Sequence, residues 1–157
     1  MSDIYLTIKL IHILGSAVLF GTGLGIAFFM WMAHRTRDPA AIAQTARVVV
    51  IADAAFTATA VVIQPLSGYA MMRLTGFTFS HFWIAASLTL YVLVGLCWLP
   101  VVWIQMELRK LAAAAARDGA ALPARYFVLF RIWFWLGWPA FLGVVAIFAL
   151  MIWKPLW

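Results

Sequence analysis

His12 is the side chain of this sequence best suited to hold a metal or a cofactor. It lies in an apolar segment that begins at Ile4, roughly 12 Å from the start of that segment if the segment is a helix. An imidazole at that depth in an apolar medium needs a hydrogen-bond partner or a metal. Two interpretations are open. The ring is bonded to a polar group on another helix, for which Gln64 and Tyr91 lie at the matching level, or it is an axial ligand of a haem.

The neighbours of His12 on the same helix suit a flat macrocycle. Small residues would leave room for it, namely Gly15, Ser16 and Gly23. Lys9, one turn further out, would then meet a propionate; otherwise its side chain reaches the membrane surface. Tyr91 would line the distal side. The resulting hypothesis is haem b with His12 as the metal ligand, in a redox or haem-handling role, and the sequence identifies no catalytic residue.

Asp53 is a second ionisable residue within an apolar segment. It lies about six residues inside Arg47, roughly 9 Å from the end of that segment. An isolated carboxylate is costly at such a position. We therefore predict a structural ion pair with Arg131, which lies near the start of the last apolar segment. The alternative is a carboxyl group that takes part in a proton relay.

Gly21 and Gly25 form a G-x-x-x-G pair on the side of the helix opposite His12. Such pairs allow two helix backbones to approach closely in a membrane, so we predict a helix-packing contact at this pair. The contact favours a rival hypothesis, a non-catalytic scaffold or accessory subunit of a larger membrane complex. Its partner would be another membrane protein or a second copy of the chain. A small permease is a third alternative.

Composition identifies the elements that must position these residues. The chain has 157 residues, of which 67% are hydrophobic and 10% are charged. Soluble domains have about 25% charged residues, so this composition excludes a soluble globular protein, and its high hydrophobicity excludes disorder. The formal charge of +6 comes mostly from residues beside apolar segments. It therefore indicates orientation in a lipid bilayer and no nucleic-acid partner.

Four segments are long enough to cross the hydrocarbon core as helices, which takes roughly 20 apolar residues each. They are Ile4–Met32, Val48–Met72, Phe82–Met106 and Tyr126–Trp153. With helical flanks, we place the spans at about 4–32, 44–73, 82–111 and 124–153. The expected fold is all-α: a polytopic membrane protein with a single domain over residues 1–157, folded as a four-transmembrane-helix up-down bundle.

The basic residues predict how the bundle is oriented. Eight of them flank the first and third connectors: Arg35, Arg37, Arg47, Arg109, Lys110, Arg117, Arg125 and Arg131. Three lie toward the other side: Lys9, Arg73 and Lys154. Because cytoplasmic connectors carry the excess of Lys and Arg, we expect connectors 33–43 and 112–123 in the cytoplasm and both termini outside. The expected location is the bacterial cytoplasmic (inner) membrane, crossed several times.

Five sequence segments together resemble a bacterial family of predicted integral membrane proteins of unknown function. The resemblance covers nearly the whole chain and rests on Lys9–Leu14, Leu19–Gly25, Ile63–Gly68, Cys97–Trp103 and Trp133–Phe141. It implies the four-helix membrane architecture and no particular activity.

The first span is also similar to the opening helix of the HemJ-type protoporphyrinogen oxidases, which are four-helix membrane haem proteins. The similarity rests on Lys9 and on His12-Ile13 followed by small residues, and it implies haem on His12. It does not extend beyond the first span, so it does not imply porphyrinogen oxidation. The span is similar as well to helices of the CopD-type copper-resistance proteins. Copper is less favoured, because copper sites use several Met, His or Cys residues at one depth.

Overall fold

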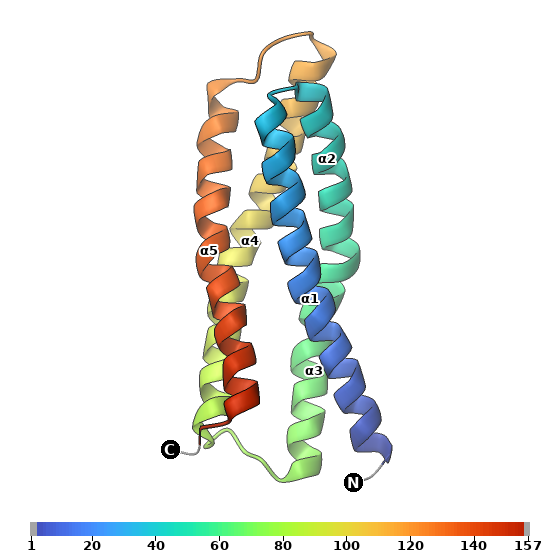
Figure 1. Cartoon of the computed structure of the whole chain (residues 1–157), viewed down its shortest axis with the longest axis vertical. Coiled ribbons are helices and arrows are strands. Elements are labelled where there is room, and N and C mark those ends of the chain that lie inside the picture. Colours follow the sequence, from blue (N-terminus) through green and yellow to red (C-terminus); the bar gives the residue numbers. More distant parts are fainter. Residues whose placement is uncertain (1–2, 156–157) are drawn as a thin grey trace.

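All of the regular structure in this chain is helical. The computed structural model describes residues 3–155, and this part of the chain contains no strand (Figure 1). The helices run Asp3–Thr36 (α1), Pro39–Ala52 (α2), Asp53–Thr57 (η1, a π-helix), Ala58–Thr75 (α3), Phe82–Arg117 (α4) and Ala124–Trp153 (α5). The all-α prediction is confirmed.

Four helical segments are long and apolar enough to cross a membrane. The second of them, Pro39–Thr75, is continuous through α2, η1 and α3, and the other three are α1, α4 and α5. This confirms the prediction of four transmembrane helices. The helices are longer than we expected, and the first connector, predicted at 33–43, consists of residues 37–38 alone.

The connectors are short because local residues reverse the chain sharply. Arg37 has a left-handed φ of 58°, and the Asp38 side chain then accepts a hydrogen bond from the Ala40 amide at 2.9 Å. Pro39 follows at the first helical position, which proline tolerates because its missing amide hydrogen would be unpaired there. Gly76 and Gly119 end their helices with positive φ angles of 77° and 61°, a conformation that favours glycine.

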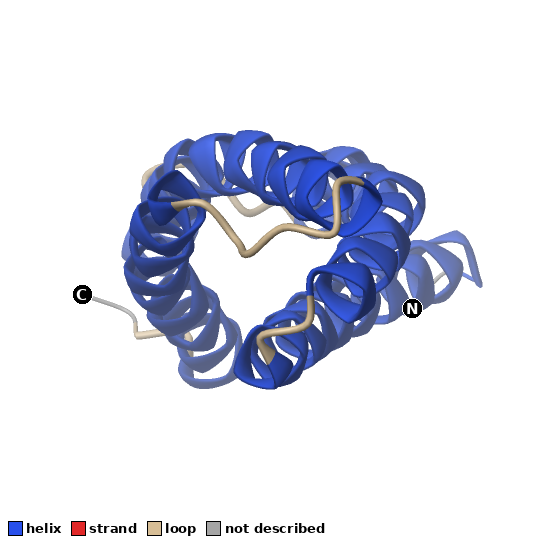
Figure 2. Cartoon of the chain, turned by 90° about the horizontal axis from the view of Figure 1, so that it is seen from above, coloured by secondary structure: helices blue, strands red, loops and turns tan. Residues whose placement is uncertain are grey.

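The bundle has two ends with different composition. We call the end formed by residues 34–39 and 112–125 the basic end, and the end formed by residues 3–6, 75–83 and 151–155 the terminal end. The helices form a ring when viewed from the basic end (Figure 2). In this ring α1 packs on α2, α3 and α5, while α4 packs on α2 and α5.

The hydrophobic core lies in the half of the bundle near the basic end. Its buried members come from α1, α2, α4 and α5 together: Ile26, Met30, Ala33, Ile42, Ala46, Val49, Ile104, Leu108, Ala112, Tyr126, Leu129, Phe130 and Trp133. Tyr126 is fully buried, and its hydroxyl lies 3.3 Å from Nδ1 of His34. His34 in turn stacks on Phe130 with a ring separation of 3.7 Å.

The half near the terminal end is packed less completely. There α3 leans on α1 and does not pack along α4 as α2 does. Met30 and Gly23 are about two turns apart and share one face of α1, yet Met30 is fully buried and Gly23 is exposed. Among the described residues of α5, the buried ones are Tyr126, Leu129, Phe130 and Trp133, all in its first ten residues. The faces of α1 and α5 in this half are therefore more exposed than in the core, while α3 and α4 still bury Gln64, Ser67, Trp83 and Ser87.

The π-helix η1 is a feature that the sequence did not predict. It spans Asp53–Thr57 and lies between the closely packed half and the open half of the second span. A π turn adds a residue to the helical repeat, and such turns are frequent at functional sites. The side chains after η1 are consequently rotated relative to those of an uninterrupted helix.

The asymmetry of the core leads to a prediction for two leucines of α4. Leu108 is fully buried in the core, whereas Leu96 is 61% exposed on the surface that faces lipid. Leu108→Ala should lower the free energy of unfolding by about 2–5 kcal/mol because it leaves a cavity, and Leu96→Ala should change it by about 0.5 kcal/mol or less. Unfolding in detergent measures both, and equal effects would contradict the assignment of the core.

Candidate functional site

His12 lies at the contact between α1 and α3. It is about five turns from Met30 on the same helix, so the two residues share the inward face of α1. Nδ1 of its ring is 2.8 Å from the Ser67 hydroxyl. The ring also lies against Gly68, where an added Cβ would be only 3.4 Å from His12 Cε1. We expected Gln64 or Tyr91 as the partner of the imidazole; the partner in the structure is Ser67.

The hydrogen bonds of Ser67 determine which ring nitrogen carries the proton. Its hydroxyl, which has a single hydrogen, donates to the Ile63 carbonyl at 2.6 Å. The same oxygen also lies 3.2 Å from the Gln64 carbonyl. With the hydroxyl hydrogen directed to either carbonyl, the oxygen accepts from His12, and on that basis we assign the proton of the neutral imidazole to Nδ1. Nε2 of this tautomer then carries the lone pair, and the Gln64 backbone also lies within hydrogen-bond reach of the imidazole.

Gln64 fastens α3 to the backbone of α1 beside the imidazole. Its Nε2 donates to the His12 carbonyl at 2.8 Å, and its side chain is mostly buried. The approach depends on Gly15, because a Cβ there would lie 2.6 Å from Gln64 Nε2. Gly15 and Gly68 thus allow the two helices to meet closely around His12 and Ser67.

Tyr91 has a structural partner at the same level of the bundle. Pro65 cannot donate the helical hydrogen bond to the carbonyl four residues earlier, which belongs to Val61. The Tyr91 hydroxyl donates a short hydrogen bond to that carbonyl. This bond links α4 to α3 in the half of the bundle where those helices otherwise pack little. The hydroxyl of Tyr91 is therefore already engaged.

The other residues predicted near a cofactor are less tightly held. Lys9 is exposed, with its ammonium 6.0 Å from the centre of the Tyr5 ring. The Ser16 hydroxyl donates to the Ile13 carbonyl of its own helix at 2.7 Å. Gly23 has no described atom within 4 Å of an added Cβ. Of the five predicted residues, His12 and Tyr91 make hydrogen bonds to another helix, and both bonds are made to α3.

Asp53 belongs to a second polar cluster, which joins η1, α4 and α5. Its Oδ1 accepts from the Trp98 indole at 3.3 Å. With the Gln105 amide oriented to satisfy both of its neighbours, the amide nitrogen donates to Asp53 Oδ2 at 3.2 Å, and the amide oxygen accepts from the Trp133 indole at 3.3 Å. Asp53 and Gln105 are only 5% and 2% exposed. The carboxyl group is thus satisfied by neutral donors.

The structure does not bring Asp53 and Arg131 together. The Arg131 side chain is exposed, and no ion pair joins the two residues in the part of the chain that the structure describes. The reason lies in the order of the helices. The second span packs on α1 and α4, and α5 lies diagonally across the ring from it. Asp53 therefore meets Trp98 and Gln105 of α4 and not the start of α5.

Gly21 and Gly25 make no packing contact within this chain. No atom of the described residues lies within 4 Å of a Cβ added at either position. The predicted helix-packing contact is therefore absent inside the bundle, and this face of α1 remains available to a partner outside the chain.

Any metal on His12 would have few protein ligands. Among the described residues, no group of three or more His, Cys, Asp or Glu side chains gathers in one place. A cofactor that supplies most of its own metal ligands, as a porphyrin does for iron, is compatible with a single imidazole.

Sequence analysis missed Ser67 and Gly68 as neighbours of the imidazole, and it missed Trp98 and Gln105 as partners of Asp53. It assigned Gly15 to leave room for a macrocycle, whereas the Gln64 amide occupies the space beside Gly15 in the structure. The sequence did contain one indication that the segments around His12 and Ser67 matter. Lys9–Leu14 and Ile63–Gly68 are two of the five segments that carry the family resemblance. These two segments supply the contact between α1 and α3.

Comparison with known proteins identifies the family. A model of the predicted integral membrane proteins designated DUF2269 matches residues 6–155, so the chain belongs to this family. No curated protein and no solved structure matches the chain.

The close approach at Gly15 generates a testable prediction. Gly15→Ala should displace the Gln64 amide from the His12 carbonyl and lower the free energy of unfolding by about 1–3 kcal/mol. Gly23→Ala is the matched control, and it should be neutral or stabilise by up to about 1 kcal/mol because alanine favours helix. In a Gln64→Ala background the cost of Gly15→Ala should disappear. Additive effects in this double-mutant cycle would refute the coupling.

A further prediction concerns Asp53. Asp53→Asn replaces one acceptor oxygen by a donor that faces the Trp98 or Gln105 donor, so the free energy of unfolding should fall by about 1–3 kcal/mol. Arg131→Gln should change it by about 0.5 kcal/mol or less. The change in the free energy of unfolding of the double variant should equal the sum of the changes in the two single variants. A measured coupling energy between the two positions would instead support the predicted ion pair.

Proposed function

We propose that this integral membrane protein binds haem b, with Nε2 of His12 as an axial ligand to the iron. The observation that carries the proposal is the hydrogen bond from His12 Nδ1 to Ser67, because it leaves the lone pair on the other ring nitrogen. A histidine that ligates a metal almost always donates its second ring N–H to a fixed acceptor.

The surroundings of His12 agree with a large apolar ligand. The imidazole belongs to the inward face of α1, and the inward faces of this half of the bundle are only partly covered. The porphyrin supplies four nitrogen ligands itself, so one protein ligand is enough to hold it. When bound, haem supplies one-electron chemistry at its iron. The protein then needs to fix the ring, exclude water and neutralise the propionates.

Other residues have roles in this proposal that follow from their positions. Lys9 lies one turn closer to the terminal end than His12, and its ammonium would reach a propionate. Ser16 and Gly23 are small residues on or near the inward face and would border the macrocycle. Tyr91 would contribute its ring to the opposite wall, since its hydroxyl is engaged by Val61. The role of the bound haem would be electron transfer or haem handling.

The distribution of charge supports an orientation for this site. In the bacterial cytoplasmic membrane, the basic end would face the cytoplasm by the positive-inside rule. Both termini and the His12 half of the bundle would then lie toward the outside. A haem on His12 would exchange electrons with partners on that side.

A second candidate function is a scaffold or accessory subunit in a larger membrane complex. The observation that favours it is the unoccupied face of α1 at Gly21 and Gly25, where no described atom would touch an added Cβ. Another membrane protein or a second copy of the chain could pack there through the glycine pair. In that case Gly21→Leu would release a co-purifying partner and leave any absorption spectrum unchanged.

The haem proposal is tested by absorption spectroscopy of the protein purified in detergent and titrated with haemin. We expect a Soret band, with α and β bands on reduction, and we expect His12→Ala to abolish them. Ser67→Ala should weaken haem binding by about 10–100-fold, because it removes the acceptor that orients the ligand.

His81→Ala is the matched control, since His81 is a histidine of the terminal end whose Nδ1 contacts only Thr78 in the described residues. Its spectrum should equal that of the wild type. A well-folded protein that remains colourless with added haemin would refute the proposal, and so would an unchanged spectrum in His12→Ala.

A further inference from the structure

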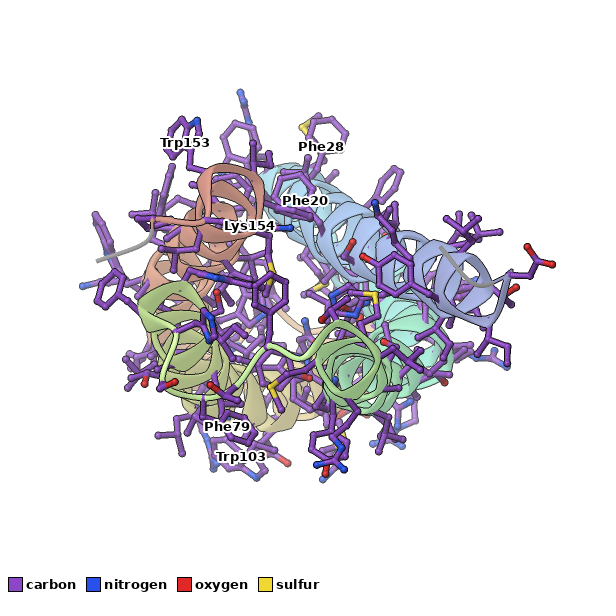
Figure 3. All side chains as sticks on the ribbon, turned by 90° about the horizontal axis from the view of Figure 1, so that it is seen from below. Phe20, Phe28, Phe79, Trp103, Trp153 and Lys154 are labelled. Atoms are coloured by element: carbon purple, nitrogen blue, oxygen red, sulfur yellow. The ribbon has the colours of Figure 1, made fainter. Side chains whose placement is uncertain are left out.

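The terminal end of the bundle holds an exposed lysine whose ammonium lies over two aromatic rings. Lys154 follows α5 directly and has a left-handed φ of 43°. Viewed from this end, its side chain lies over the ring of helices, whereas Trp153 projects outward (Figure 3). The Lys154 ammonium is 5.5 Å from the centre of the Trp83 ring and 6.0 Å from the centre of the Phe77 ring.

This ammonium has aromatic neighbours, and no ion pair joins it to an acidic side chain within residues 3–155. The ion pairs of the described residues involve Glu107 and Asp118, both remote from Lys154 in the fold. Contacts with aromatic faces attract a cation but leave its charge unneutralised. The positive charge at this position is therefore available to an anion.

Two buried donors of α4, one in the ring beside Lys154 and one a turn further along the helix, also lack acceptors among the described residues. Trp83 Nε1 and Ser87 Oγ make no hydrogen bond with any described residue, although Trp83 is 7% exposed and Ser87 is 5% exposed. The two residues are four apart on α4, so they share one face of the helix. A buried donor without a partner is costly. These two donors indicate an acceptor that the described chain does not supply.

The first turn of α4 adds backbone donors at the same place. The amides of Ile84 and Ala85 both bond to the His81 carbonyl, while no described residue accepts from the amides of Phe82 and Trp83. No side chain caps this 36-residue helix at its N-terminus. A helix N-terminus of this kind carries partial positive charge and binds anions.

We propose that Lys154, Trp83, Ser87 and the start of α4 form a site for an oxyanion, namely the phosphate group of an anionic lipid or free phosphate. The ammonium supplies charge, and the indole, hydroxyl and two amides supply donors around the oxyanion. The position at the end of four membrane-spanning helices suits a lipid headgroup whose chains lie along the bundle. This site is separate from His12 and does not depend on haem binding.

The test has two measurements. Native mass spectrometry measures lipid binding, and thermal unfolding measures stabilisation by phosphate. The protein is offered phosphatidylglycerol or phosphatidylcholine in detergent micelles, and separately inorganic phosphate against chloride at equal ionic strength. We expect phosphatidylglycerol to bind more tightly than phosphatidylcholine. Lys154→Gln should weaken the binding of phosphatidylglycerol about tenfold or more, as for a hydrogen bond to a charged group.

Two pairs of variants make the comparison specific. Lys9→Gln removes the other lysine near this end and should bind phosphatidylglycerol as the wild type does. Trp83→Phe keeps an aromatic ring under Lys154 but removes the indole donor, and it should weaken binding several-fold. Trp153→Phe, at an exposed indole of the same end, should not. If Lys154→Gln fails to fold, the comparison of Trp83→Phe with Trp153→Phe still tests the site.

The two sources of the oxyanion give different outcomes. Stabilisation by inorganic phosphate that Lys154→Gln abolishes would support a soluble anion, and selective binding of phosphatidylglycerol alone would support the lipid. Equal binding of the two lipids, with no stabilisation by phosphate, would overturn the proposal. An equal loss in Lys154→Gln and Lys9→Gln would also overturn it, because it would reflect net charge alone.

Discussion

The hydrocarbon core of a bilayer neither donates nor accepts hydrogen bonds, and this constraint explains how the polar side chains of the bundle are arranged. Pro65 leaves the Val61 carbonyl without its helical donor, and the Tyr91 hydroxyl of another helix replaces it. Asp53 obtains donors from Trp98 and Gln105. These bonds join helices that apolar packing alone would not align, because lipid solvates apolar side chains as well as a neighbouring helix does.

The same constraint draws attention to the polar atoms that the chain leaves unsatisfied. Trp83 Nε1 and Ser87 Oγ are two of them among the described residues, and both lie in the half of the bundle near the terminal end. Thr57 Oγ1, in η1 at the middle of the bundle, is a further buried atom without a partner among the described residues. Nε2 of His12 carries the lone pair of the imidazole, since the proton is assigned to Nδ1 beside Ser67.

The sequence was sufficient for the number and type of the helices, because each apolar segment is long enough to span the hydrocarbon. Counting residues along the segments also placed Gln64 and Tyr91 at the level of His12, and both residues do make bonds there. The counting did not predict which side chain meets the ring. Depth along a helix is fixed by rise per residue, but direction around the helix changes at a π turn, and η1 lies between Arg47 and Gln64.

The structure does not contain the predicted ion pair between Asp53 and Arg131, for a related reason. Asp53 and Arg131 have suitable depths, but the choice of neighbour depends on the order of helices around the ring, and α5 lies diagonally opposite the second span. Hydropathy cannot distinguish adjacent helices from diagonal ones in a four-helix bundle. Likewise, Gly15 and Gly68 differ from Gly21 and Gly25 only in what lies opposite them.

The concentration of the core at one end gives the molecule an inherent polarity across the bilayer. Side chains from four helices close the bundle at Met30, Leu108 and Tyr126, so this end acts as a plug. The opposite end has no equivalent apolar core among the described residues, and its helices are joined by the hydrogen bonds of Ser67, Gln64 and Tyr91. The two halves of the bundle therefore present different surroundings to anything that lies between the helices: an apolar core near the basic end, and polar side chains such as Gln64 and Ser67 toward the terminal end.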